Sequence, residues 1–272
     1  MSDRIQKTFR ELAASGRTGI IPFVTVGFPD VETTLELVPA LSGAGADVIE
    51  LGIPFSDPLA DGATIQKASF HALRQGMTLE RCLEVCSILR ERGLETPLVF
   101  MGYYNPILAF GLKAFSVEAQ KAGLDGVIVA DLPPDESGPL RKECSYQGID
   151  VVCLLAPTST DERIAAACAN VSGFVYCVSL AGVTGARDQL STDGLRLVER
   201  VRAHTDLPIA VGFGISRREH IEVVGKYADA VVVGSALVNV IDAAPPGEGV
   251  ARAVKFLSDL RAIPEPYNRG IA

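Results

Sequence analysis

Eight short apolar segments recur along the chain, and most of them lead into a longer segment with helical periodicity. The apolar segments are rich in Val, Ile and Leu and lack polar alternation, which is typical of strands buried on both faces. The predicted strands are Ile20–Val26, Val48–Leu51, Leu98–Met101, Val127–Ala130, Val151–Leu155, Phe174–Val178, Ile209–Val211 and Ala230–Val233. Strands that alternate with helices in this way predict a parallel sheet.

Amphipathic segments fill most of the intervals between these strands. They are Val31–Ser42, Leu79–Arg92, Leu112–Ala122, Glu136–Gln147, Asp161–Ala169, Gly194–His204 and Arg217–Tyr227. A further helix, Arg4–Ala14, precedes the first strand, and another, Gly249–Arg261, follows the last. We therefore predict an α/β fold, a single-domain (β/α)8 TIM barrel over residues 1–272 with an extra N-terminal helix. A doubly wound open sheet is the alternative, but no G-x-G-x-x-G follows the first strand.

One type of turn recurs just before the strands. Sequences such as Gly-Ala-Asp and Gly-Leu-Asp-Gly end the preceding segment, and they place Asp47, Asp125, Asp150 and Asp229 at the starts of four strands. Glycine suits the left-handed residue that ends a helix. The repetition indicates that one α-to-β connection is used several times.

The charge and the cysteines restrict the possible partners and compartments. With 25 Lys and Arg against 33 Asp and Glu, the net charge is −8, which argues against a nucleic-acid or membrane partner. No apolar run is long enough to span a bilayer, and the N-terminus lacks the apolar core of a signal peptide. The six scattered cysteines and only three histidines predict reduced packing thiols, no metal site and a cytoplasmic protein.

The segment from Glu50 to Gly62 is the strongest candidate for chemistry. Glu50 ends a buried strand, where an acid is costly without a partner or a task. The loop that follows carries Asp57 and Asp61, and barrel enzymes place their catalytic groups on such loops. The alternative is a paired structural acid at Glu50 and a helix N-cap at Asp61.

Glycines after the last two strands predict a phosphate site. Gly212-Phe213-Gly214 and Gly234-Ser235 allow several backbone N–H groups to approach one anion, and a short helix after the last strand adds its positive end. Tight βα turns are the alternative. The loop Gly182–Arg187 has two glycines that suit a hinged lid, or it is an ordinary surface loop. Tyr103 lies at another strand end, where it supplies a hydroxyl or forms a wall.

Several of these segments resemble the tryptophan synthase alpha subunit family. The resemblance covers nearly the whole chain and rests on the sequence from Glu50 to Gly62. It also rests on Pro22–Thr25, Tyr104–Pro106, Val129–Pro133, Gly182–Gly185 and Val211–Ile215. It implies a barrel that cleaves indole-3-glycerol phosphate to indole and glyceraldehyde 3-phosphate, the last stage of tryptophan biosynthesis. It implies no cofactor on this subunit. The implied partner is a beta subunit that uses pyridoxal phosphate, in a heterotetramer of two alpha and two beta chains.

The resemblance also implies residue roles. Glu50 matches the general acid and base, and its pKa would be raised by walls of Phe23, Ile49 and Tyr176. Asp61 matches the carboxylate that pairs with the indole N–H. Substrate contacts are implied for Phe23, Tyr103, Ile128, Tyr176, Thr184 and Phe213, and phosphate contacts for Gly185, Gly214, Gly234 and Ser235.

The partner contact is implied for the same loop. Pro54 and Asp57 match its subunit-facing part, although a local turn explains Asp57 nearly as well. The sequence departs from many relatives at Leu180, where they have Arg, and its tail after Arg261 carries two prolines.

Three other functions compete with this interpretation. Another phosphate-binding barrel, such as an indole-glycerol-phosphate synthase or a sugar-phosphate isomerase, would share the glycines but need no Glu50–Asp61 loop. Such enzymes also favour a lysine at a strand end, whereas Lys67 and Lys113 lie on predicted helices. A non-catalytic activating subunit and a stand-alone lyase are the remaining alternatives.

Overall fold

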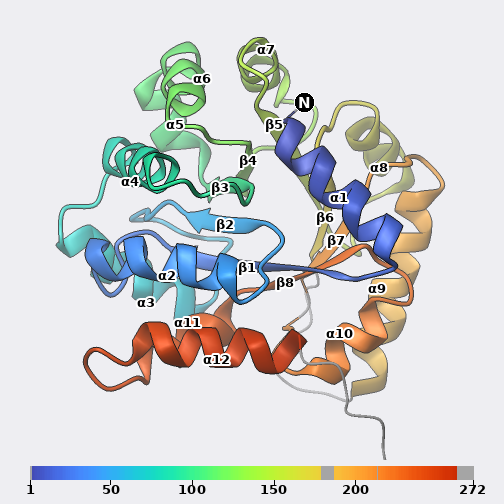
Figure 1. The fold of residues 1–272 in the computed structure, drawn as a ribbon. Coiled ribbons are helices and arrows are strands. Elements are labelled where there is room, and N and C mark those ends of the chain that lie inside the picture. The colour runs from blue at the N-terminus through green and yellow to red at the C-terminus, as the bar shows by residue number, and fades with distance from the viewer. Residues whose placement is uncertain (1, 179–186, 213, 262–272) are drawn as a thin grey trace, which may run out of the picture.

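The fold is a closed barrel of eight parallel strands, seen in a computed structural model that describes residues 2–178, 187–212 and 214–261 (Figure 1). Each strand pairs with the next in sequence, and β8 pairs with β1. The strands are β1 Gly19–Thr25, β2 Ile49–Gly52, β3 Leu98–Gly102, β4 Gly126–Val129, β5 Asp150–Leu155, β6 Val175–Val178, β7 Ile209–Gly212 and β8 Ala230–Val233. The predicted TIM barrel and all eight predicted strands are confirmed.

Helices surround the barrel on its outside, as Figure 1 shows. They are α1 Asp3–Ser15, α2 Val31–Gly43, α3 Ala63–Arg74, α4 Leu79–Glu91, α5 Tyr104–Phe110, α6 Leu112–Lys121, α7 Gly138–Tyr146, α8 Asp161–Cys168, α9 Arg187–Arg202, α10 Arg218–Val224, α11 Ser235–Asp242 and α12 Gly249–Arg261. Within the described ranges, no helix is long and apolar enough to cross a membrane.

Three helices differ from the sequence-based expectation. The helix predicted from Gly194 begins earlier, at Arg187, and includes Gly194 although glycine weakens a helix interior. Neither α3 nor α5 has a predicted range, and α5 contains Pro106. A proline in the first helical turn removes an N–H group that has no intrahelical partner in any case, so it does not prevent a helix there.

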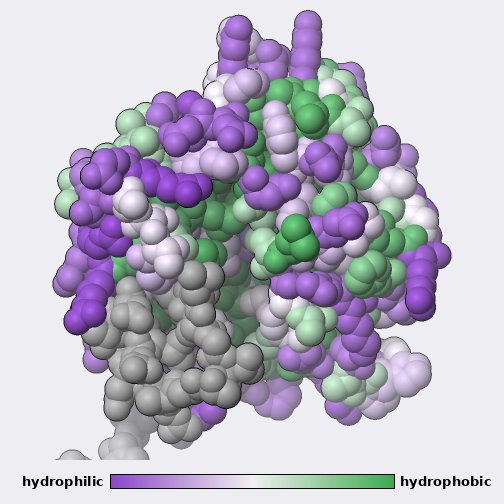
Figure 2. Space-filling model, turned by 180° about the vertical axis from the view of Figure 1, so that it is seen from behind, coloured by the Kyte–Doolittle hydropathy of each residue, from purple (hydrophilic) through white to green (hydrophobic). Residues whose placement is uncertain are grey.

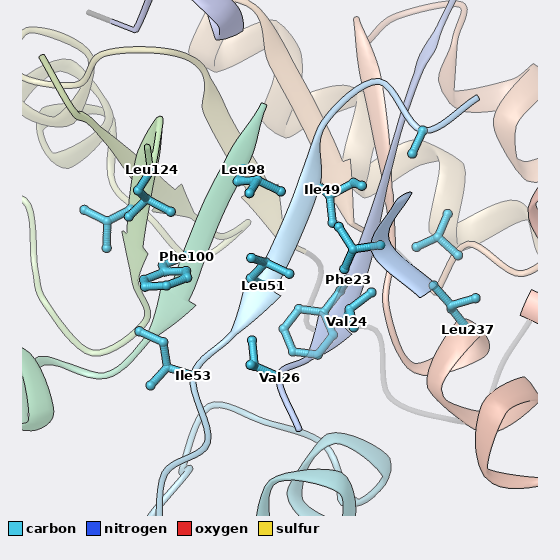
Figure 3. Close-up of a cluster of buried hydrophobic side chains, with 14 of the residues drawn as sticks. Phe23, Val24, Val26, Ile49, Leu51, Ile53, Leu98, Phe100, Leu124 and Leu237 are labelled. Atoms are coloured by element: carbon cyan, nitrogen blue, oxygen red, sulfur yellow. The ribbon is translucent and has the colours of Figure 1, made fainter. Parts of the chain in front are cut away.

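Alternation along the strands separates two hydrophobic cores. Side chains that point outward, such as Ile49, Leu51, Leu98 and Phe100, pack in a cluster that includes buried residues of the surrounding helices (Figure 3). Side chains at the intervening positions, such as Val48, Val99 and Val152, fill the barrel interior. Successive residues of a strand face opposite sides, so alternate positions generally join different cores. Phe23 is an exception, because it packs in the same cluster as its neighbour Val24.

Helix α1 closes the end of the barrel where the strands begin. Its buried residues Ile5, Phe9 and Leu12 belong to the interior cluster, and the rings of Phe9 and Phe174 lie 5.5 Å apart. A Cβ atom on Gly19 would lie 2.7 Å from a methyl group of Leu12, so the absence of a side chain there gives the helix its space. The extra N-terminal helix is thus part of the barrel core.

The repeated aspartates hold the starts of neighbouring strands together. Asp47, Asp125 and Asp229 each donate their N–H to the carbonyl of one residue on the preceding strand, at 2.9, 3.0 and 2.9 Å. Each carboxylate also accepts the N–H of that same residue, from Ile20, Leu98 and Ile209, at 2.8, 2.9 and 2.7 Å. Three of the four repeated aspartates therefore share one structural role, whereas the Asp150 carboxylate accepts the N–H of Ser2 at 3.0 Å.

Asp125 is the most strongly embedded of the three. It is 2% exposed and accepts hydrogen bonds from the Ser2 hydroxyl at 2.6 Å and from Arg90 at 2.5 Å, with Arg4 at 3.3 Å. This carboxylate thereby joins β3, α4 and the start of α1.

We expect Asp125→Ala to lower the free energy of unfolding by about 3–5 kcal/mol, because it leaves the Arg90 charge and the Leu98 N–H without their partner. Urea unfolding followed by circular dichroism measures the loss. Asp161→Ala is the control, since Asp161 pairs with Arg200 at the surface and its side chain is 70% exposed. That variant should lose about 1 kcal/mol or less, and equal losses in the two variants would contradict the assigned role of Asp125.

Candidate active site

Glu50 points into the barrel interior near the carboxyl ends of the strands. It lies two residues after the interior residue Val48 and is aligned with Phe23 of β1 and Val99 of β3. Glu50 is only 1% exposed to solvent. Neither carboxylate oxygen has a hydrogen-bond partner among the described residues. A buried acid in this state is unfavourable for folding, which marks it as a functional candidate.

The environment of Glu50 favours its protonated form. Burial, together with the nearby charge of Asp61, raises the pKa of Glu50 to about 8. At neutral pH the carboxyl group therefore holds its proton and can donate it. The expectation that Ile49 lies beside this carboxyl group is wrong. Ile49 points outward into the other core because adjacent side chains alternate.

Two rings lie over glycines beside Glu50. A Cβ atom on Gly52 would lie 2.3 Å from the Phe23 ring, and one on Gly212 would lie 2.5 Å from the Tyr176 hydroxyl. Phe23 and Tyr176 are 6% and 8% exposed. Figure 2, seen from the side opposite to Figure 1, shows a hollow with hydrophobic residues inside it. These rings therefore form apolar walls, as expected for Phe23 and Tyr176.

Asp61 lies on the loop that follows β2. It interacts electrostatically with both Glu50 and Tyr176, which places it over the same interior. Burial raises the pKa of Asp61, while a hydrogen bond from Tyr103 lowers it in part. The alternative of an N-cap does not hold, because Gly62 is the N-cap of α3 and no side-chain hydrogen bond caps that helix.

Tyr103 has a role that the sequence did not indicate. Its hydroxyl accepts the N–H of Ala60 at 3.0 Å, and its ring stacks on Phe55 with centroids 5.1 Å apart. Burial and the charge of Asp61 raise the pKa of Tyr103 above its usual range. The sequence left open whether Tyr103 supplies a hydroxyl or forms a wall, because a contact between residues 43 apart leaves no trace in the local pattern.

Thr25 ends β1 and is a further residue at the mouth of the barrel. It lies two residues after Phe23 on β1, so its side chain also faces the interior. It is 2% exposed, and its hydroxyl has no partner among the residues that the structure describes. The signal in the sequence was its parity with Phe23.

The glycines of the expected phosphate site lie on adjacent strands. Gly234 immediately precedes α11, whose first residue is Ser235, and Gly214 follows β7 with φ of +63°. Among the residues that the structure describes, no atom lies within 4 Å of a Cβ atom built on Gly214. Ile128 is 1% exposed and belongs to the interior cluster. Thr184, Gly185, Phe213 and the expected lid lie outside the described residues.

The loop between β2 and α3 has one apolar residue fully in solvent. Leu59 is 95% exposed, whereas Pro54 is buried. The Asp57 carboxylate is exposed and accepts a hydrogen bond from the Ser56 hydroxyl at 2.5 Å. A local turn therefore explains part of the position of Asp57, and a partner contact is compatible with its exposure.

Two other observations concern possible ligand sites. In the described part of the chain, no group of three or more His, Cys, Asp or Glu residues is arranged to hold a metal ion. A cavity of about 740 Å³ lies outside the barrel, lined by residues of α2, α3, α11 and α12. Glu50 and Asp61 do not line it, so it is separate from the site described above.

Comparison with known proteins identifies the family. The family model for the tryptophan synthase alpha chain matches residues 9–262. The chain belongs to the tryptophan synthase alpha chain family. The alpha chain of Roseiflexus sp. (strain RS-1) is 52% identical over 258 residues, which are 95% of this chain and 99% of the relative. That of Chloroflexus aggregans is 48% identical over 258 residues, 95% of this chain and 97% of the relative.

Solved structures of the same family superpose closely. The alpha subunit from Legionella pneumophila str. Paris gives a TM-score of 0.88 at 36% identity, with 96% of this chain and 97% of that chain covered. A chain of the a2b2 complex from Pyrococcus furiosus gives 0.85 at 41% identity, with 90% and 98% covered. The expected family is confirmed, and this tryptophan synthase alpha chain is a carbon–carbon lyase that acts on indole-3-glycerol phosphate.

We expect Glu50→Gln to be more stable than the parent protein, by a margin that grows with pH. The unfolded glutamate ionises near pH 4.3, whereas the folded one keeps its proton up to about pH 8. Stability of the parent therefore falls between these values, by at most about 1.4 kcal/mol per pH unit. The glutamine does not titrate.

Urea unfolding at pH 5, 6, 7 and 8 measures this difference. Glu91→Gln is the matched control, because Glu91 is exposed on the surface of α4. It shows the effect of the same substitution at an exposed position. A difference between Glu50→Gln and the parent that does not change with pH would contradict the raised pKa of Glu50.

Proposed function

We propose that Glu50 performs both proton transfers of the retro-aldol cleavage. In its protonated form it donates to C3 of the indole ring. The resulting carboxylate then removes the proton from the hydroxyl group on the side-chain carbon attached to C3. The bond between C3 and that side-chain carbon then breaks. The cycle returns Glu50 to its starting state. The observation that carries this assignment is the buried, unpaired carboxyl group with a pKa of about 8 at the mouth of the barrel.

Asp61 has a complementary role in this proposal. Protonation of C3 makes the ring nitrogen positively charged, and a carboxylate next to its N–H stabilises that charge. Asp61 interacts with Glu50 and Tyr176, which supports a position beside the same bound ring. Burial raises the pKa of Asp61, and the interaction with the Tyr103 hydroxyl offsets part of that rise, whereas Glu50 has no such partner among the described residues. The two neighbouring carboxyl groups would thus be kept in different protonation states.

The remaining site residues bind the two ends of the substrate. Phe23, Ile128 and Tyr176 would surround the indole ring and the chain carbons, together with Tyr103, Thr184 and Phe213. Gly214, Gly234 and Ser235 would bind the phosphate through backbone N–H groups, with Gly185. Support comes from their place after adjacent strands and from the N-terminus of α11 beside Gly234.

The proposed assembly is a complex with a beta subunit that carries pyridoxal phosphate. Leu59 is exposed on the loop between β2 and α3, close in sequence to Pro54 and Asp57, which supports a contact with the beta subunit at this loop. A solved relative from Pyrococcus furiosus is described as part of an a2b2 complex, and we propose the same heterotetramer here. All six cysteines are free thiols, which is consistent with a cytoplasmic protein. We also propose that residues 1–272 form one domain.

We expect Glu50→Gln to fold and to lose release of indole from indole-3-glycerol phosphate by at least about 10³-fold, since it removes the proton-transfer group. Asp61→Asn should lower kcat by a larger factor than it raises KM. For the parent, kcat/KM should fall above about pH 8 as Glu50 loses its proton. Indole release is followed continuously with the purified chain. Near-parental turnover by Glu50→Gln would overturn the proposal.

The same assay with and without the beta subunit tests the partnership. Indole release that rises strongly when the partner is added supports a subunit of a complex. Fast release that ignores the partner would identify a stand-alone lyase. A chain that only activates the beta subunit and releases no indole would be the non-catalytic alternative.

We expect Gly214→Ala to weaken binding of glycerol phosphate about ten-fold or more. Its φ of +63° strains any residue with a Cβ atom, by about 1–2 kcal/mol, and a shifted backbone misdirects the N–H groups. Inhibition of indole release by glycerol phosphate gives the affinity. Gly247→Ala, at another positive φ far from the barrel mouth, is the control for strain alone. Equal inhibition of parent and Gly214→Ala would contradict the phosphate site.

A further inference from the structure

The loop between β2 and α3 has a free tip and an anchored end. Leu59 at the tip is 95% exposed, while the N–H of Asp61 donates to the carbonyl of Pro58 at 3.0 Å. Gln66 of α3 donates to the carbonyl of Asp61 at 2.9 Å. The backbone of Asp61 is therefore held by its own loop and by α3. The orientation of its side chain needs a further contact.

Tyr103 provides that contact from the end of β3. It is 4% exposed, and its hydroxyl accepts the Ala60 N–H at 3.0 Å. A phenol can accept one hydrogen bond and donate another. Burial raises the pKa of Asp61, and the interaction with the Tyr103 hydroxyl offsets part of that rise. The hydroxyl thus engages two consecutive residues of the loop.

The ring of Tyr103 engages the opposite end of the same loop. It stacks on Phe55 with an interplanar angle of 28° and a centroid distance of 5.1 Å. The tip with Leu59 lies between Phe55 and Ala60 in the sequence. Tyr103 therefore contacts the loop on both sides of the tip, while Gln66 of α3 holds its backbone at Pro58 and Asp61. Tyr103 directly follows β3, a strand of the closed barrel.

We propose that Tyr103 is a positioning residue for Asp61, and that its stack on Phe55 couples the state of the loop tip to the orientation of the Asp61 carboxylate. The inference rests on the proposed role of Asp61 in the lyase reaction. It differs from the substrate contact implied for Tyr103 by the family resemblance. A partner that presses on Leu59 moves Phe55 and Ala60, and both movements act on the same side chain.

Tyr103→Phe tests the hydroxyl while keeping the ring and its stack. We expect kcat to fall about ten-fold or more, the effect of one lost hydrogen bond to a charged group, with KM within two-fold of the parent. The acid limb of the kcat/KM profile should move to higher pH. Among the described residues, Tyr103 is the titratable group that shifts the pKa of Asp61, and the charge of Asp61 in turn raises the pKa of Glu50 and Tyr176, which the variant leaves in place.

The double variant separates positioning from a direct contact with substrate. If Tyr103 acts through Asp61, then Tyr103→Phe should cost less than two-fold in an Asp61→Asn background. An equal cost in both backgrounds would overturn the proposal. Near-parental kcat for Asp61→Asn alone would instead overturn the role of Asp61, so the two failures can be told apart. Tyr104→Phe, which removes the neighbouring phenol on α5, is the control and should retain parental turnover.

Phe55→Leu tests the coupling with the hydroxyl left in place. We expect the acid limb to stay at its parental pH, while the factor by which the beta subunit raises kcat falls at least three-fold. An unchanged activation factor would overturn the coupling. Near-ultraviolet circular dichroism and thermal unfolding of each variant establish that the barrel is intact. If Tyr103→Phe fails to fold, Phe55→Leu still decides the coupling.

Discussion

The closed parallel barrel imposes one constraint on every strand, which is that alternate residues face its interior. Closure leaves no free edge, so all strand backbones are paired with their neighbours. Whether a residue occupies an odd or an even position along its strand then determines whether its side chain points toward the surrounding helices or into the barrel. Phe23, Glu50, Ile128 and Tyr176 all have interior parity, and they meet because the strands that carry them form one ring.

This arrangement gives Glu50 an environment that a surface acid cannot have. The barrel wall removes water from its carboxyl group, and the described residues supply no hydrogen bond in return. The protonated form is therefore favoured at neutral pH. Other interactions must offset the unfavourable burial of Glu50. At the opposite end of the barrel, α1 packs on the interior core, and Asp47, Asp125 and Asp229 join neighbouring strands by hydrogen bonds.

The loop after β2 adds what the barrel alone cannot provide. It brings a second carboxyl group, Asp61, over the interior and keeps it in contact with Tyr103 from β3. The two acids differ because Glu50 is enclosed by apolar walls, whereas Asp61 has a hydrogen-bond donor beside it. Their separate environments give the two carboxyl groups different tasks in the proposed reaction.

The sequence by itself determined the strands, the barrel and the candidate acids, because these depend on local periodicity and on short contiguous motifs. All eight strands lie within one or two residues of their predicted limits. The start of α9 and the helix α5 were missed, since Gly194 and Pro106 are tolerated where local preference disfavours them. The tertiary structure alone decided that Tyr103 contacts both ends of the loop between β2 and α3, and that Asp61 lies near Glu50. These facts depend on contacts between residues distant in sequence, which a local pattern does not record.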